Sequence, residues 1–208
     1  NTQTSNKYVQ LKEIKFYTEV QTSVEAPTFT PEEGKVAANN TFAEPFALTI
    51  ASATTDATIK YTLDGTDPTL ETALTYEAPI TISTMVQVRA IAVKGEEKSV
   101  EASVAYIISS SEAKPYTASE AIAAEALGLT GTVYVTGTVK NVYNTQYGNM
   151  YITDGTKELC IYGTYSADGS TRYDKLTVKP VAGDTVTVYG IIGFYSAAQM
   201  KNGWITEH

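Results

Sequence analysis

Hydrophobic and polar residues alternate with a period of two in short segments of the chain, which is typical of half-buried β-strands. In the first half, the runs Phe46–Ala51, Ile59–Leu63 and Val86–Ala92 show this alternation. Turn-forming residues separate the runs, as in the segment Asp64–Pro68, where Gly65 can adopt a positive φ. About seven short strands at this spacing predict an immunoglobulin-like β-sandwich.

The second half begins with a helix signal and continues with strands. Thr117 and Glu120 have the spacing of a capping box, and the alanine-rich segment after Thr117 predicts a short helix that ends at Gly128. Five strands follow, with inward positions at Val133, Val135, Val139, Met150, Ile152, Leu159, Ile161, Val186 and Val188 and a weaker strand over Gln199–Thr206. Gly137 would permit the sharp bend of a small barrel. Five strands and one helix predict an OB-fold.

The expected fold class is therefore all-β: an Ig-like sandwich followed by a five-stranded OB-fold barrel with one short helix. We assign residues 24–108 to the sandwich, 109–115 to a linker and 116–208 to the barrel. Residues 1–23 are interpreted as a strand remnant or N-terminal extension of a longer protein, with neighbouring domains N-terminal to this chain. The β-prone run Tyr8–Val20 suggests such a strand.

Both halves resemble known families. The strings PTFTP at 27–31, ATIKYTLDGTDPT at 57–69, YEAPITIS at 76–83 and VRAIAVKG at 88–95 resemble the chitobiase/β-hexosaminidase C-terminal domain across residues 24–108. The resemblance implies a noncatalytic accessory sandwich of secreted multidomain proteins. Residues 112–208 resemble OB-fold modules of secreted Bacteroidetes-type proteins, on the strings PYTASEA, VYVTGTV, YGNMYITD and GDTVTVYG. This second resemblance implies a fold and the location of a binding face.

Composition argues against catalysis. The only histidine among the 208 residues is His208 and the only cysteine is Cys160, so a histidine-based triad and a multi-cysteine zinc site are excluded. We therefore expect no enzyme activity, no cofactor and no metal. The acidic pair Asp64 and Asp67 is interpreted as a structural turn rather than a calcium loop, because its spacing fits no EF-hand. Cys160 is interpreted as a small, partly buried hydrophobe.

A candidate binding face follows from the alternation in the second and third barrel strands. If Met150, Ile152, Leu159 and Ile161 point inward, then Tyr151, Thr153, Cys160 and Tyr162 point outward, on the face where OB-folds bind ligands. We expect the loops Tyr143–Gly148 and Ser196–Asn202 to flank this face. The candidate ligand-binding residues are Tyr147, Tyr151, Tyr162, Tyr195 and Trp204. Packing under loops or against the first module is the alternative role of these aromatic residues.

The expected function is a noncatalytic binding or spacing pair in a secreted or cell-surface protein, with polysaccharide as the partner. Single-stranded nucleic-acid binding, as an accessory to a secreted nuclease, is the alternative. The formal net charge of −8 disfavours it, since nonspecific nucleic-acid affinity depends on Lys and Arg. Most of this negative charge belongs to the first half, with 12 acidic and 5 basic side chains at 24–111 against 9 and 7 at 112–208. The chain contains no apolar run long enough to span a membrane.

Overall fold

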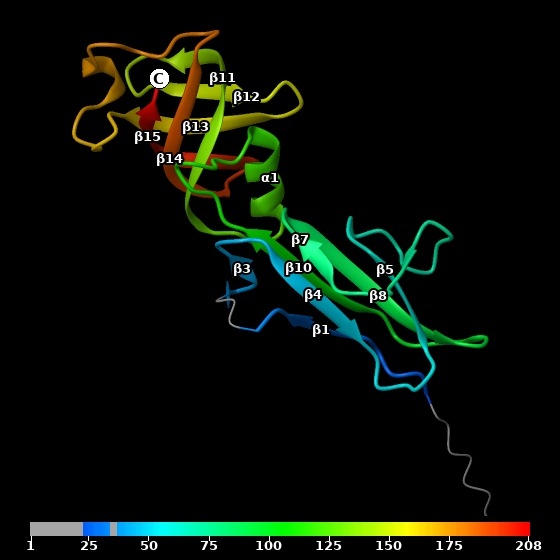
Figure 1. The fold of residues 1–208 in the computed structure, drawn as a ribbon. Coiled ribbons are helices and arrows are strands. Elements are labelled where there is room, and N and C mark those ends of the chain that lie inside the picture. The colour runs from blue at the N-terminus through cyan, green and yellow to red at the C-terminus, as the bar shows by residue number, and fades with distance from the viewer. Residues whose placement is uncertain (1–22, 34–36) are drawn as a thin grey trace, which may run out of the picture.

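The computed structural model describes residues 23–33 and 37–208, which form a β-sandwich and a β-barrel arranged end to end (Figure 1). The strand predicted at Tyr8–Val20 lies outside the described residues. Within the described residues, all strand pairing stays within the sandwich or within the barrel, and two separate clusters of buried hydrophobic residues form the cores. About half of the described residues are in strands, which confirms the predicted fold class of a sandwich followed by a five-stranded barrel with one short helix.

The sandwich consists of two packed sheets. The smaller sheet has the order β1-β4-β7, and the larger has the order β2-β3-β10-β8-β5-β6, with β9 paired to β8. The strand bounds are β1 Thr28–Pro31, β2 Ala37–Ala38, β3 Thr41–Phe42, β4 Phe46–Ala51, β5 Thr58–Thr62, β6 Leu74–Thr75, β7 Ile80–Ile82, β8 Val86–Lys94, β9 Glu97–Lys98 and β10 Ala102–Ile108. Phe46, Leu48 and Ile50 of β4 point inward as the alternation predicts, and stabilise the sandwich by burying their side chains.

Two predictions about the strands of the sandwich differ from the structure. The sequence predicts a closing strand over Val100–Ile107. In the structure this strand begins at Ala102, and the Val100 side chain is exposed. The strands β1, β2 and β3 were missed because they have four residues or fewer, too short for a period-two pattern. The turn after β5 forms as predicted: Gly65 has a φ of 76°, and the Asp64 carboxylate accepts hydrogen bonds from the backbone and the hydroxyl of Thr66.

The barrel begins with helix α1 (Ala118–Ala126), and its capping box forms as predicted. The Thr117 hydroxyl accepts a hydrogen bond from the Glu120 backbone N–H, and the Glu120 carboxylate accepts one from the Thr117 N–H. Ala118, Ala121 and Ala124 are fully buried in the barrel core. The small alanine side chains let the helix pack closely against the strands.

Five strands close into a barrel with the order β11-β12-β13-β15-β14, in which β14 returns to β11. Their bounds are β11 Gly131–Asn144, β12 Asn149–Thr153, β13 Glu158–Tyr165, β14 Thr185–Phe194 and β15 Ala198–Glu207, with a 3₁₀ helix at Tyr173–Lys175 between β13 and β14. β11 pairs with β14 in its first half and with β12 in its second, and Thr138 is the residue that pairs with both. A Cβ atom on the neighbouring Gly137 would lie only 3.0 Å from the Thr153 carbonyl oxygen. A side chain at this corner would require the neighbouring strand to shift by a few tenths of an ångström, so the close approach favours glycine.

The segment between the two units is hydrogen-bonded to both of them. The Ser109 N–H donates to the carbonyl oxygen of Phe42 in β3, and the Ser110 hydroxyl accepts from the N–H of Tyr134 in β11. Ser111 and Lys114 exchange two backbone hydrogen bonds, which closes a turn between them. The predicted linker thus has a defined conformation anchored at each end.

Candidate ligand-binding face of the barrel

The alternation in β12 and β13 has the predicted phase. Met150 and Ile152 of β12 are fully buried, as are Leu159 and Ile161 of β13. The intervening residues Tyr151 and Tyr162 are exposed by 36% and 57%. Cys160, between Leu159 and Ile161, is partly exposed. The outward side chains of β12 and β13 therefore lie on the face predicted from the sequence.

Strand register arranges these outward residues in two adjacent rows. In the first row Tyr151 of β12 is opposite Cys160 of β13, and Cys160 is opposite Gln199 of β15. In the second row Tyr162 of β13 is opposite Lys201 of β15. Tyr151 and Tyr162 are thus diagonal neighbours, a separation that aromatic side chains can bridge. We call the surface made by Tyr143, Tyr151, Cys160, Tyr162, Gln199 and Lys201 the outer face.

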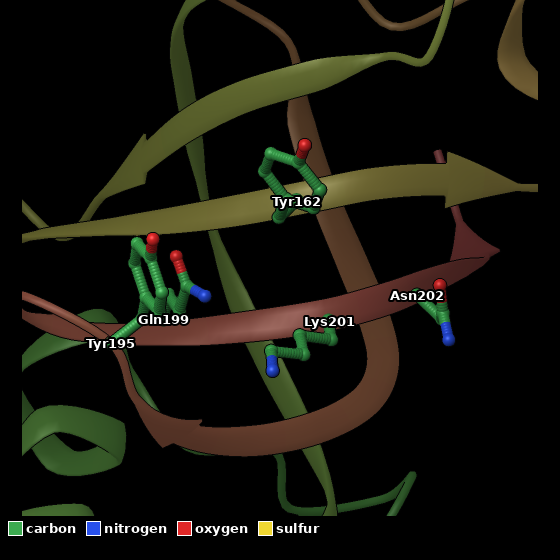
Figure 2. A pocket seen from close by; sticks show the side chains of 5 residues that line it. All are labelled: Tyr162, Tyr195, Gln199, Lys201 and Asn202. Carbon is green, nitrogen blue, oxygen red and sulfur yellow. The ribbon is translucent and has the colours of Figure 1, made fainter.

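A groove of about 450 Å³ lies on the β13–β15 side of the outer face. It is lined by Tyr162 from β13, Tyr195 from the turn after β14, and Gln199, Lys201 and Asn202 from β15. Figure 2 shows the Gln199 amide beside the Tyr195 ring, with Tyr162 on the neighbouring strand. Two aromatic rings and two amides therefore border the same open space.

Tyr143 completes the aromatic part of the outer face from β11. Its ring centroid is 5.4 Å from that of Tyr151, and its hydroxyl oxygen is 3.3 Å from the Cys160 Sγ. Burial, followed by the hydrogen bond to the Cys160 thiol, raises the pKa of Tyr143 above its ordinary value. The phenol is therefore neutral at physiological pH and remains a hydrogen-bonding group.

Two of the predicted site residues lie away from both the outer face and the groove. The Arg172 guanidinium carbon is 5.1 Å from the centroid of the Tyr147 ring, a cation–π arrangement at the start of the 3₁₀ helix. Trp204 of β15 packs against Tyr189 of β14, with ring centroids 5.6 Å apart, and Tyr189 packs in turn against Tyr134 of β11. The structure therefore brings Tyr151, Tyr162 and Tyr195 to one face and places Tyr147 and Trp204 among other partners.

The flanking loops are shorter than predicted. β11 continues to Asn144, so Tyr143 is a strand residue, and β15 starts at Ala198, so Gln199–Asn202 belong to a strand. These differences explain why Tyr143, Gln199, Lys201 and Asn202 were not among the predicted site residues. A β-bulge between Tyr189 and Ile191 changes the phase of β15, and single-sequence alternation cannot locate such an irregularity.

The described residues that line the groove are two tyrosines, two amides and one lysine. No carboxylate lines the groove. Among the residues that the structure describes, no group of three or more His, Cys, Asp or Glu side chains could hold a metal ion, and no helix is long and apolar enough to cross a membrane.

Comparison with known proteins gives one family relationship, and it concerns the sandwich. No curated protein and no solved structure gave a significant match to the chain. The matched family comprises Ig-like, noncatalytic accessory domains of carbohydrate-active enzymes. Residues 37–105, within the sandwich, match the family model of the chitobiase/beta-hexosaminidase C-terminal domain, which confirms the resemblance seen in the sequence.

Proposed function

We propose that the chain is a noncatalytic carbohydrate-binding unit and that the barrel binds polysaccharide on its outer face. The observation that carries the proposal is the groove between the exposed rings of Tyr162 and Tyr195, bordered by the amides of Gln199 and Asn202. Aromatic rings stack against the apolar faces of sugars, while amides both donate hydrogen bonds to hydroxyl groups and accept them. Both kinds of contact are available to one ligand here.

The sandwich would serve as the spacer that holds the barrel relative to a catalytic domain. Its match to the family model supports this role, because such domains accompany carbohydrate-active enzymes. The hydrogen bonds at Ser109 and Ser110 would transmit its orientation to the barrel. A polysaccharide ligand and this family relationship together support a secreted or cell-surface location.

A glycan array with the purified chain, followed by calorimetric titration of each positive glycan, tests the proposal. We expect affinity to fall at least severalfold in Tyr162→Ala, since a stacked ring contributes on the order of 1–3 kcal/mol on the nucleobase scale. Tyr134→Ala is the matched control, because this ring packs against Tyr189 outside the outer face. Absence of binding to every glycan, or equal loss in both variants, would contradict the proposal.

Salt dependence separates the carbohydrate from the nucleic-acid alternative. Phosphate contacts release counterions, so affinity for single-stranded DNA would fall steeply between 50 and 200 mM salt. Binding to a neutral glycan should change little over the same range. If only oligodeoxythymidylate binds, with a steep salt dependence and through Tyr162, the nucleic-acid alternative replaces our proposal.

A further inference from the structure

We infer that the outer face selects an acidic oligosaccharide, in which a uronate carboxylate pairs with the ammonium group of Lys201. This inference rests on the proposed carbohydrate function and specifies its ligand class. Among the residues that the structure describes, Lys201 is the only charged one that lines the groove. A carboxylate bound there would meet a cation and no competing acidic side chain.

Within the described residues, four of the five other Lys and Arg side chains of the barrel have a hydrogen-bond or ion-pair partner, and Lys157, on the exposed β12–β13 turn away from the groove, has none. Lys140 pairs with Glu158, and both Arg172 and Lys175 pair with Asp174. The Lys179 ammonium donates to the Leu176 carbonyl oxygen at 2.7 Å. Within the described part of the chain, Lys201 makes no hydrogen bond or ion pair through its side chain. Its charge is therefore available to a ligand in the groove.

The strand register places this charge where a substituent of a stacked sugar would lie. Lys201 is directly opposite Tyr162 in the parallel pair of β13 and β15, and neighbouring strands of a sheet lie about 4.8 Å apart. A sugar ring stacked on Tyr162 would thus have its exocyclic group within reach of the flexible lysine stem. Gln199 lies two residues earlier on the same strand and lines the same groove, where its amide can bind ring hydroxyls.

The sparse charge favours a uronate over a nucleic acid. A nucleic-acid strand presents one phosphate per nucleotide, and proteins that bind it provide a positively charged groove along the backbone. The groove here has a single cation, in a chain with a formal net charge of −8. One ionic contact together with ring stacking fits a ligand that contacts the groove mainly through uncharged groups and places one carboxylate beside Lys201.

Matched oligosaccharides give the sharpest test. The probes are oligogalacturonate, oligomannuronate and a glucuronate-containing oligomer, each compared by calorimetry with its fully methyl-esterified, neutral form. We expect the acidic form of at least one probe to bind about threefold to tenfold more tightly, which is the scale of one ion pair at a partly solvated site. The preference should decrease as salt rises, with a slope near that of one ion pair.

Charge-removing variants assign the preference to one residue. Lys201→Gln should abolish the difference in affinity between acid and ester. Lys157→Gln removes the same charge from the exposed β12–β13 turn of the same barrel, and should leave the preference intact. Circular dichroism checks that both variants fold.

The possible results distinguish this inference from the proposed function. Equal affinity for acid and ester, or a preference that persists in Lys201→Gln, would overturn the inference while carbohydrate binding stands. Absence of binding to all glycans, acidic or neutral, would overturn the proposed function as well. Tight binding of oligodeoxythymidylate with a salt slope of several ions would replace the uronate with a nucleic acid.

Discussion

The hydroxyl of Tyr116 donates a 2.6 Å hydrogen bond to the carbonyl oxygen of Ile108. Tyr116 belongs to the buried core of the barrel, and Ile108 ends the last strand of the sandwich. The bond therefore connects the two units through a buried polar contact beside the linker. Met85 of the sandwich also packs against the barrel core, so the junction combines a hydrogen bond with apolar contact.

Removal of this hydroxyl should destabilise the protein. Tyr116→Phe leaves the Ile108 carbonyl without that donor in a buried position, and we expect a loss of about 1–2 kcal/mol in the free energy of unfolding. Urea denaturation followed by tryptophan fluorescence measures this loss. Tyr195→Phe, which removes a hydroxyl from an exposed residue, is the control and should change stability little. Equal stability of wild type and Tyr116→Phe would show that the bond contributes nothing.

Tyr116 should also contribute to the loss of stability at alkaline pH. Burial raises the pKa of Tyr116 from 10.0 to about 12, and the interaction with the Ser110 backbone, which lowers the pKa, only partly opposes this. Because the unfolded phenol ionises first, its contribution to stability is complete below pH 10 and is lost as pH rises toward 12. Tyr116→Phe should lose less stability than wild type between pH 10 and 12, measured by thermal unfolding at each pH. An identical slope in both proteins would contradict the assignment.

Gly148 should tolerate no side chain. It has a φ of 69°, and a Cβ atom there would overlap the Thr164 hydroxyl and lie 2.5 Å from the Tyr173 Cβ. We expect Gly148→Ala to destabilise the barrel by more than about 2 kcal/mol, because overpacking adds to the cost of the left-handed conformation. Gly155→Ala is a matched control with a φ of 88° and open space around it, and it should cost only about 1 kcal/mol. Chemical denaturation measures the free energy of unfolding of both variants. Similar losses in the two variants would rule out the steric explanation.

Asp154 should make the barrel sensitive to acid. Its carboxylate accepts hydrogen bonds from the Ser119 N–H in the first turn of α1 and from the Thr156 and Lys157 N–H groups. Burial tends to raise the pKa of Asp154, but these hydrogen bonds outweigh burial and hold the pKa well below its usual value. The stabilisation is therefore complete above about pH 4 and is lost as pH falls below that range.

Asp154→Ala tests this contribution. At pH 7 we expect a loss of about 1–2 kcal/mol in the free energy of unfolding, because backbone donors at the helix start and the turn lose their acceptor. The difference from wild type should shrink as pH falls from 4 toward 2. Glu112→Ala, at an exposed linker position, serves as the charge control. A difference that stays constant with pH would show that the charge of Asp154 is not involved.

Tyr151 should contribute to ligand binding independently of folding. Once a glycan ligand is found, Tyr151→Ala should weaken its binding at least severalfold, because the ring stands on the outer face next to Tyr143. Tyr147→Ala is the control, since this similarly exposed tyrosine packs with Arg172 instead. Calorimetry with thermal melts separates binding from stability. An unchanged affinity in Tyr151→Ala would restrict the site to the Tyr162–Tyr195 groove.

Local sequence signals predicted much of the fold. Alternation identified the buried faces of β4, β12 and β13, since a period of two directly specifies which side chains share a face. The capping box at Thr117 and Glu120 and the turn at Gly65 were also predicted, because each depends on side chains within a few residues. The accessory-domain family of the sandwich was recognisable from short strings for the same reason.

The composition of the candidate site depended on contacts between distant residues. Tyr162 and Lys201 are opposite each other only because β13 and β15 pair in parallel across the barrel, a register that no local pattern encodes. The bulge in β15 and the extension of β11 moved Lys201 and Tyr143 from predicted loops onto the outer face. Sequence by itself therefore determined the strands, their buried sides and the two outward tyrosines of β12 and β13. Only the tertiary structure decided which lysine and amide side chains lie beside these tyrosines, because barrel closure sets the pairing of strands far apart in the chain.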